Sequence, residues 1–81
     1  MKIVWDEPKR RLNLESRGLD FADLDLDFFA GSLVVPAKRG RSMAIGRFRD
    51  QVISVVFMPL GKEAVAVISM RIASRKERSV L

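Results

Sequence analysis

Residues 42–71, SMAIGRFRDQVISVVFMPLGKEAVAVISMR, decide the fold of this 81-residue chain. The pattern has a period of two over Ser42–Arg49 and Ala64–Arg71, which is typical of strands whose alternate side chains face opposite sides. Val52–Met58 is apolar on both faces and is therefore predicted to be a central strand. Met58–Gly61 suits a type I turn, and the links between the strands are short. This stretch predicts an antiparallel meander.

The sequence before the meander predicts two helices and two short strands. Asp6 can cap a helix that Gly18 would end in the left-handed conformation. A second helix is favoured over Asp20–Phe29, because its leading aspartates would lie at the positive end of the helix dipole, although the segment also alternates like a strand. Short strands are expected at Lys2–Trp5 and Ser32–Val35.

A short helix is expected after the meander. Ser74-Arg75-Lys76-Glu77 matches the Ser-x-x-Glu capping box, in which the first and last side chains satisfy each other's backbone N–H groups. Residues 1–81 are therefore predicted to form a single α+β domain. Its parts would be two N-terminal helices, a curved antiparallel sheet of about four strands and a short C-terminal helix.

The composition excludes several kinds of chemistry. The chain has no Cys, His or Tyr, which removes disulfides, thiolate zinc sites, histidine-based triads and His-ligated metals. The aspartates between residues 20 and 27 do not form a calcium loop, because Leu24 and Leu26 are the spacers and Phe28 stands where glycine is required. No metal or other cofactor is expected. No segment has the apolar length of a signal peptide or membrane span, so we expect a cytoplasmic protein without a membrane partner.

The net charge of +5 is distributed unevenly along the chain. Residues 1–37 carry a net charge of −2 and residues 38–81 carry +7. A basic half predicts a polyanionic partner, which could be RNA, DNA or an acidic protein. The alternative is a basic protein that its charge keeps soluble.

Two groups of basic residues are candidates for phosphate contacts. The first is predicted to bind RNA and contains no acid: Lys38, Arg39, Arg41, Arg47 and Arg49. A charged edge that prevents aggregation would give the same pattern. The second begins at the end of the last strand and continues into the helix after it: Arg71, Arg75, Lys76, Glu77 and Arg78. A fixed guanidinium can stabilise a pentacovalent phosphate without metal, and a nearby carboxylate could move the proton. In the alternative interpretation Glu77 only caps the helix and the arginines are solvated.

The sequence resembles the BrnT family, the ribonuclease toxins of bacterial type II toxin–antitoxin pairs. The matching segments occur in order along almost the whole chain: Trp5-Asp6-Glu7-Pro8-Lys9, Asn13-Leu14, Gly18, Phe21, Arg41–Gly46, Ile68–Ala73 and Glu77-Arg78. The resemblance implies a RelE-like fold and an endoribonuclease in which the RNA 2′-hydroxyl attacks the adjacent phosphate without metal. The matching catalytic candidates are Arg41, Arg71, Glu77 and Arg78, with Arg75 added to the RNA-binding residues.

The resemblance also implies a protein partner, a ribbon-helix-helix antitoxin, and leaves a homodimer open. The chain departs from the family pattern at four places: Arg17 replaces a histidine, Gly40 an acid, Ala66 a basic residue, and Phe57–Leu60 a Tyr-Thr-x-Arg stretch. Two interpretations follow, a toxin of weakened activity or a catalytically silent relative that keeps the antitoxin- or RNA-binding surface. A DNA-binding regulator is disfavoured, because no helix-turn-helix or ribbon signature is present.

Overall fold

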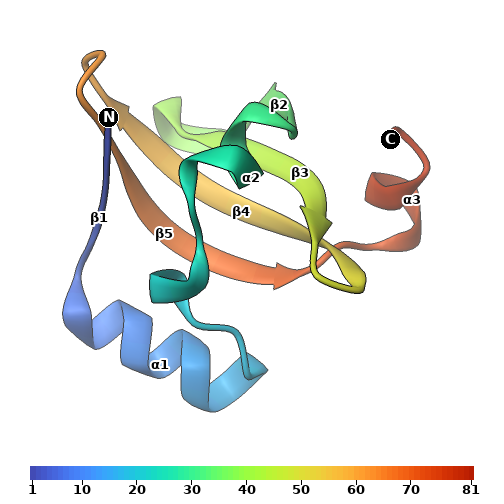
Figure 1. Cartoon of the computed structure of the whole chain (residues 1–81), viewed down its shortest axis with the longest axis horizontal. Helices are drawn as coiled ribbons and strands as arrows, with labels where there is room; N and C mark the ends of the chain where they lie inside the picture. Colours follow the sequence, from blue (N-terminus) through green and yellow to red (C-terminus); the bar gives the residue numbers. More distant parts are fainter.

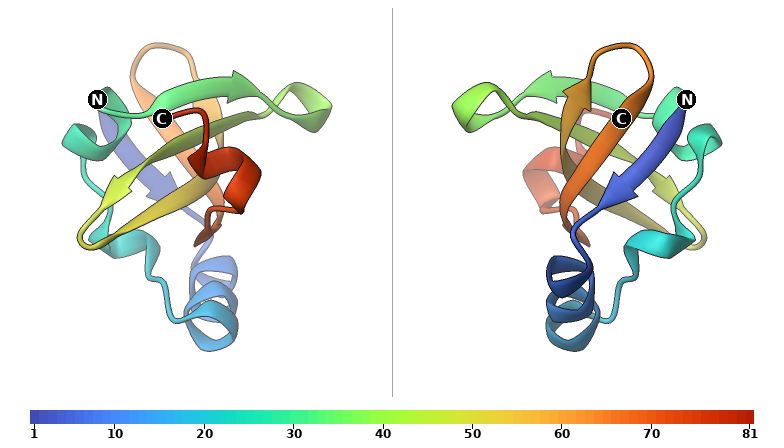
Figure 2. Two further views of the ribbon diagram at one scale, coloured as in Figure 1. Left: turned by 90° about the vertical axis from the view of Figure 1, so that its right-hand side faces the viewer. Right: turned by 90° about the vertical axis from the view of Figure 1, so that its left-hand side faces the viewer.

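A computed structural model describes residues 1–81 as a curved five-stranded sheet with helices on both sides (Figure 1). The elements, in chain order, are β1 (Lys2–Trp5), α1 (Glu7–Arg17), the 3₁₀ turn η1 (Phe21–Asp23), α2 (Leu26–Ala30), β2 (Leu33–Pro36), the 3₁₀ turn η2 (Lys38–Gly40), β3 (Ser42–Phe48), β4 (Gln51–Leu60), β5 (Ala64–Ile72) and α3 (Arg75–Arg78). The strand order in the sheet is β1-β5-β4-β3-β2. Figure 2 shows α2 and α3 on opposite sides of this sheet.

The fold is α+β, but the predicted arrangement of two N-terminal helices and about four antiparallel strands is wrong. The meander β3-β4-β5 is antiparallel, as predicted, and β2 joins it at the edge of β3. The fifth strand is β1, which pairs with β5 in parallel, so the sheet is mixed. A parallel pair between the two ends of the chain leaves no local signal, because its hydrogen bonds depend on the whole intervening fold.

Only one N-terminal helix has substantial length. In α1 the Asp6 carboxylate accepts a hydrogen bond from the backbone N–H of Lys9 at 3.2 Å, and Gly18 ends the helix with φ 70°, as predicted. The expected second helix is divided into η1 and the five-residue α2. Asp20 and Asp25 each accept a backbone N–H, and each therefore starts a new short helix. Asp20 and Asp25 are thus helix caps, and the four aspartates do not form one acidic helix face.

The turn predicted at Met58–Gly61 lies further along the chain. β4 continues to Leu60, and the turn to β5 follows it. Pro59 is tolerated inside β4 because β3 pairs with β4 only as far as Phe57, so β5 is the only neighbour of β4 at that point.

The hydrophobic core lies between the sheet and the segment α1–η1–α2. Its largest fully buried side chains are Phe21, Ile53, Met70 and Val55. Gly46 of β3 lies against the turn between α2 and β2, where a Cβ atom would clash with the side chain of Ser32. Such close approach explains why this position of the strand has no side chain.

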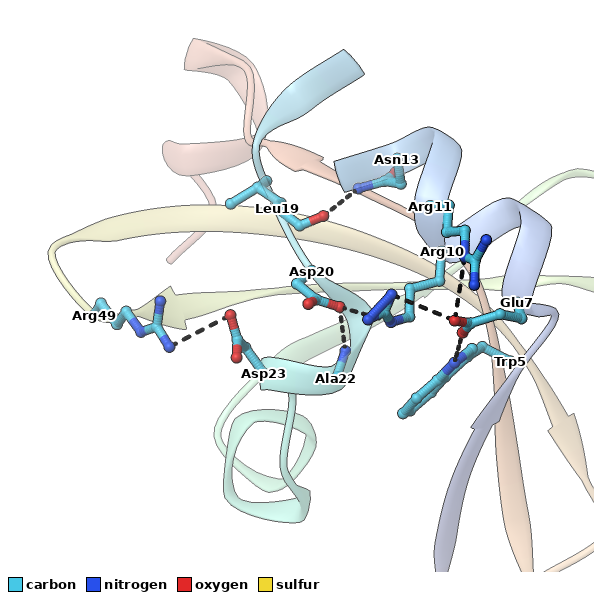
Figure 3. Close-up of polar contacts among 10 residues, drawn as sticks. All are labelled: Trp5, Glu7, Arg10, Arg11, Asn13, Leu19, Asp20, Ala22, Asp23 and Arg49. Atoms are coloured by element: carbon cyan, nitrogen blue, oxygen red, sulfur yellow. Dashed lines mark hydrogen bonds and ion pairs between the residues drawn. The ribbon is translucent and has the colours of Figure 1, made fainter. Parts of the chain in front are cut away.

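Helix α1 is held to the sheet by a buried polar residue. The side-chain oxygen of Asn13 accepts a hydrogen bond from the Met70 N–H at 3.1 Å, and its amide nitrogen donates to the Leu19 carbonyl at 2.9 Å. β1 pairs with β5 only as far as Val67, so Asn13 satisfies the edge of β5 beyond that point. Figure 3 shows Asn13 with Leu19, and beside them the ion pairs that Arg10 makes with Asp20 at 3.2 Å and with Glu7.

Candidate functional site

Arg71 and Glu77, two of the functional candidates, lie on the face of the sheet opposite the core. The β4–β5 register places Arg71 directly opposite Ser54, so their side chains share this face. Ile45 of β3 lies opposite Ser54 on the other side and is also buried. The short helix α3 covers this part of the sheet through Glu77.

A capping box fixes the position of Glu77. The Ser74 hydroxyl accepts the Glu77 N–H at 3.1 Å, and Glu77 Oε1 accepts the Ser74 N–H at 2.8 Å, as the sequence predicts. Because Glu77 lies at the third position of α3, the same carboxylate also faces the sheet. Its side chain is only 15% exposed.

Arg71 and Glu77 form a bidentate ion pair. Arg71 Nη1 donates to Glu77 Oε1 and Nη2 donates to Oε2, both at 2.7 Å. Nη1 also donates to the Ile72 carbonyl at 3.3 Å. The N–H donors that remain, on Nε and Nη2, lie along one edge of the guanidinium. That edge has the spacing that two oxygens of a phosphate require.

The ion pair shifts the pKa of both side chains. The hydrogen bonds from Arg71 are the main cause that lowers the pKa of Glu77 to about 2, and the Ser74 N–H and the Ser54 hydroxyl lower it further against the opposing effect of burial. The hydrogen bond to Glu77 raises the pKa of Arg71 above its usual value. Glu77 is therefore an ionised carboxylate at neutral pH.

Arg71 also lines a cleft with Arg41 and Lys38. The cleft has a volume of about 400 Å³ and its lining residues are Pro36, Ala37, Lys38, Arg41, Met43, Val56 and Arg71. We call it the cationic cleft. It brings together side chains that are 30 residues apart in sequence, and it contains no carboxylate among its lining residues. A concave surface with only positive charges suits a phosphate backbone.

The turn η2 positions the basic residues at the rim of the cationic cleft. Arg39 and Gly40 have φ of 60° and 73°, so the chain reverses tightly between β2 and β3. The Ala37 N–H donates to the Arg41 carbonyl at 2.8 Å and closes this turn. Left-handed backbone at a non-glycine residue is costly and is frequent at functional sites. Arg41 is half-buried, and its buried Nε has no hydrogen-bond acceptor in the protein.

The predicted RNA-binding residues do not form one patch. Arg49 makes an ion pair with Asp23 at 3.5 Å and stacks on the ring of Phe48 at 4.8 Å. Arg47 lines a different pocket, together with Asp23, Asp25 and Asp27. These two arginines thus lie among acids, away from the cationic cleft. Arg75 and Arg78 are exposed on α3.

Ser54 is the site residue that the sequence reasoning missed. It is 1% exposed, and its hydroxyl donates to Glu77 Oε1 at 3.0 Å. A single polar residue inside an otherwise apolar central strand is the signal that could have found it, because a buried hydroxyl needs a partner.

The structure has a larger groove along α1, with a volume of about 630 Å³. It is lined by Glu7, Pro8, Arg11, Leu12 and Glu15, so acids outnumber bases and a phosphate would be repelled. The chain has no group of three or more His, Cys, Asp or Glu side chains arranged to hold a metal ion. None of its helices has the length and apolar character needed to cross a membrane.

Comparison with known proteins identifies the family. Residues 5–77 match the model of a family described as the ribonuclease toxin BrnT of type II toxin–antitoxin systems. The chain belongs to the BrnT family. It is also similar to a crystal structure of the ribonuclease toxin BrnT from Brucella abortus, with 55% identity and a TM-score of 0.87 over 93% of this chain and 99% of that one. Among curated proteins none matches the chain.

Membership of the BrnT family confirms the resemblance that the sequence motifs indicate. A type II ribonuclease toxin has RNA as its substrate and an antitoxin as its partner.

The low pKa of Glu77 predicts how the free energy of unfolding changes at acid pH. Because the pKa of Glu77 is about 2 in the folded protein against an ordinary 4.5, the unfolded chain binds more protons between these values. The stabilisation from Glu77 is complete above pH 4.5 and is lost as the pH falls toward 2. We expect the free energy of unfolding, measured by urea titration, to fall less steeply over this range in Glu77→Gln than in the wild type. Parallel pH profiles for the two proteins would contradict the assignment.

Proposed function

We propose that this BrnT-family chain is an active endoribonuclease that cleaves single-stranded RNA in the cationic cleft without a metal ion. The observation that carries the proposal is the convergence of Arg41 and Arg71 on one concave surface, with the guanidinium of Arg71 held by Glu77. The reaction requires stabilisation of the charge that develops on a phosphorane, and fixed guanidinium groups supply it.

Arg71 is the proposed transition-state donor. Three of its N–H groups are occupied by Glu77 and the Ile72 carbonyl, and the remaining edge is available to two phosphate oxygens. The RNA 2′-oxygen forms a bond to phosphorus and the bond to the 5′-oxygen breaks. The 2′-hydroxyl gives its proton to water and the leaving 5′-oxygen takes one from water, so the products are a 2′,3′-cyclic phosphate and a 5′-hydroxyl.

The other candidates receive different roles. Arg41 and Lys38 hold the phosphate in the cationic cleft, and Arg39 lies in the turn beside it. Glu77 positions Arg71 rather than moving the proton, since a carboxylate with a pKa of about 2 is a weak base at neutral pH. Arg75 and Arg78 contact RNA outside the cleft, as the exposure of both on α3 allows.

We also propose that the antitoxin belongs to the ribbon-helix-helix class and that both proteins act in the cytoplasm. The antitoxin is supported by the family membership. The shared compartment is supported by the requirement that an antitoxin reach the toxin that it neutralises. The cationic cleft is the surface that an acidic segment of such a partner would complement electrostatically.

Cleavage should depend on the guanidinium of Arg71. Arg71→Ala should lower the cleavage rate of a labelled mRNA roughly 10²–10³-fold, the usual effect of losing one transition-state donor. Arg71→Lys should recover little activity, because an ammonium does not offer a planar fork. Cleavage by the wild type should persist in excess EDTA and leave 2′,3′-cyclic phosphate ends.

Thermal unfolding of each variant controls for loss of the fold, because Arg71→Ala also removes the partner of Glu77. If the wild type cleaves no more RNA than a folded Arg71→Ala variant, the chain is the catalytically silent relative and the proposed activity is wrong.

Binding should depend on salt through the basic residues at the cleft. Because each phosphate contact releases a counterion, Arg41→Gln should reduce the slope of log affinity against log salt by about 0.7 for single-stranded RNA. Arg49→Gln removes the same charge from a side chain that is already paired with Asp23, and it should change the slope less. The measurement uses 2′-O-methyl RNA, which lacks the attacking hydroxyl. Equal slopes for wild type and Arg41→Gln would exclude a phosphate contact at Arg41.

A further inference from the structure

Ser54 is a buried polar residue in the middle of an apolar strand. It lies in β4 between Ile53 and Val55, both fully buried, and is itself 1% exposed. Besides Asn13, whose hydrogen bonds hold α1 to the sheet, it is the only buried polar residue of the chain. Burial of a serine hydroxyl costs free energy unless the hydroxyl makes a hydrogen bond, so the role of Ser54 depends on what its hydroxyl binds.

The hydroxyl of Ser54 is the one side-chain contact that joins the Glu77 carboxylate to the central strand β4. Glu77 Oε1 accepts from Arg71 at 2.7 Å, from the Ser74 N–H at 2.8 Å and from Ser54 at 3.0 Å. Arg71 and Ser74 lie within six residues of Glu77, whereas Ser54 lies 23 residues away. Without Ser54, every group that holds the carboxylate would belong to the same C-terminal segment.

The rigidity of Arg71 follows from this arrangement. The helix α3 has four residues, and a helix so short does not stay folded by its own hydrogen bonds. The backbone of Arg71 is fixed in β5, but a carboxylate held only by α3 and the long side chain of Arg71 would move with them. Ser54 belongs to a strand with neighbours on both sides, so its hydroxyl gives the pair a fixed point of reference.

We propose that Ser54 is a positioning residue for RNA cleavage, which fixes the Glu77 carboxylate and through it the guanidinium of Arg71 at the cationic cleft. The proposal rests on the proposed function. Ser54 itself does not touch the RNA, because the ion pair lies between it and solvent. Its effect should therefore appear in the turnover of bound RNA and not in the affinity for RNA.

The test compares Ser54→Ala and Ser54→Cys with a matched control. The cysteine variant keeps the size of the side chain but donates weakly, so it separates the hydrogen bond from packing. Ser32→Ala is the control, since its hydroxyl also makes a partly buried hydrogen bond, to the Phe28 carbonyl at 2.6 Å, but neither residue lines the cationic cleft or contacts Glu77. Both Ser54 variants should lower kcat about tenfold with little change in KM, while Ser32→Ala should leave kcat unchanged.

A second readout does not depend on activity. In NMR titrations, Ser54→Ala should raise the pKa of Glu77 above its value of about 2, because one of the hydrogen bonds that lower it is lost. The Nη–H signals of Arg71 should be resolved in the wild type and averaged by rotation in Ser54→Ala. Unchanged kcat in the Ser54 variants, or an unchanged Glu77 titration with an unchanged Arg71 spectrum, would overturn the proposal.

The two readouts also separate this proposal from the proposed function. A wild type that cleaves no RNA would overturn the proposed function and, with it, any role of Ser54 in cleavage. The NMR measurement would still decide whether Ser54 holds the ion pair.

Discussion

The carboxylate of Glu77 joins three elements of the fold, α3, β5 and β4. It caps α3 through Ser74, accepts two hydrogen bonds from Arg71 at the end of β5, and is bound by Ser54 in the centre of β4. Charge-assisted bidentate hydrogen bonds are among the strongest polar contacts in proteins. Because α3 is too short to be stable alone, this one carboxylate keeps the helix over the second face of the sheet.

The same contact gives the site its chemical character. A chain without His or Cys has no side chain that titrates readily near neutral pH, so catalysis by charge stabilisation is the route open to it. For that purpose an arginine must be held still and must retain free donors. The ion pair does both, since it occupies one end of the guanidinium of Arg71 and leaves one edge of it available. Acidic residues near Arg47 and Arg49 meanwhile offset the charge of those arginines, whereas no carboxylate lines the cationic cleft.

Local signals in the sequence predict local structure well. The helix caps at Asp6 and Gly18 and the capping box Ser74–Glu77 form as predicted, and β3 and β5 lie within one residue of their predicted bounds. These features depend on neighbours in the chain. The break in the expected helix over Asp20–Phe29 was missed because helical spacing does not show that two aspartates would each cap a separate turn.

Contacts between distant segments could not be predicted from such local signals. The parallel pairing of β1 with β5, the ion pair of Arg49 with Asp23 and the contact of Ser54 with Glu77 all join segments that are far apart in the sequence. Charge along the sequence suggested one basic patch. A strand rises about 3.3 Å per residue, however, so Arg47 near the end of β3 and Arg49 in the turn after it lie far from Arg41, which precedes the strand. The candidates Arg71 and Glu77 were found because the capping box and the last strand end close together in sequence.

A double-mutant cycle on RNA cleavage tests whether Glu77 acts through Arg71. Single-turnover rates would be measured for the wild type, Arg71→Ala, Glu77→Gln and the double variant, each verified as folded. If Glu77 only positions Arg71, Glu77→Gln should slow cleavage about tenfold in the wild type and have no further effect in Arg71→Ala, because residues that act as a unit are not additive. An equal loss in both backgrounds would show that Glu77 contributes independently of Arg71, which would contradict this mechanism.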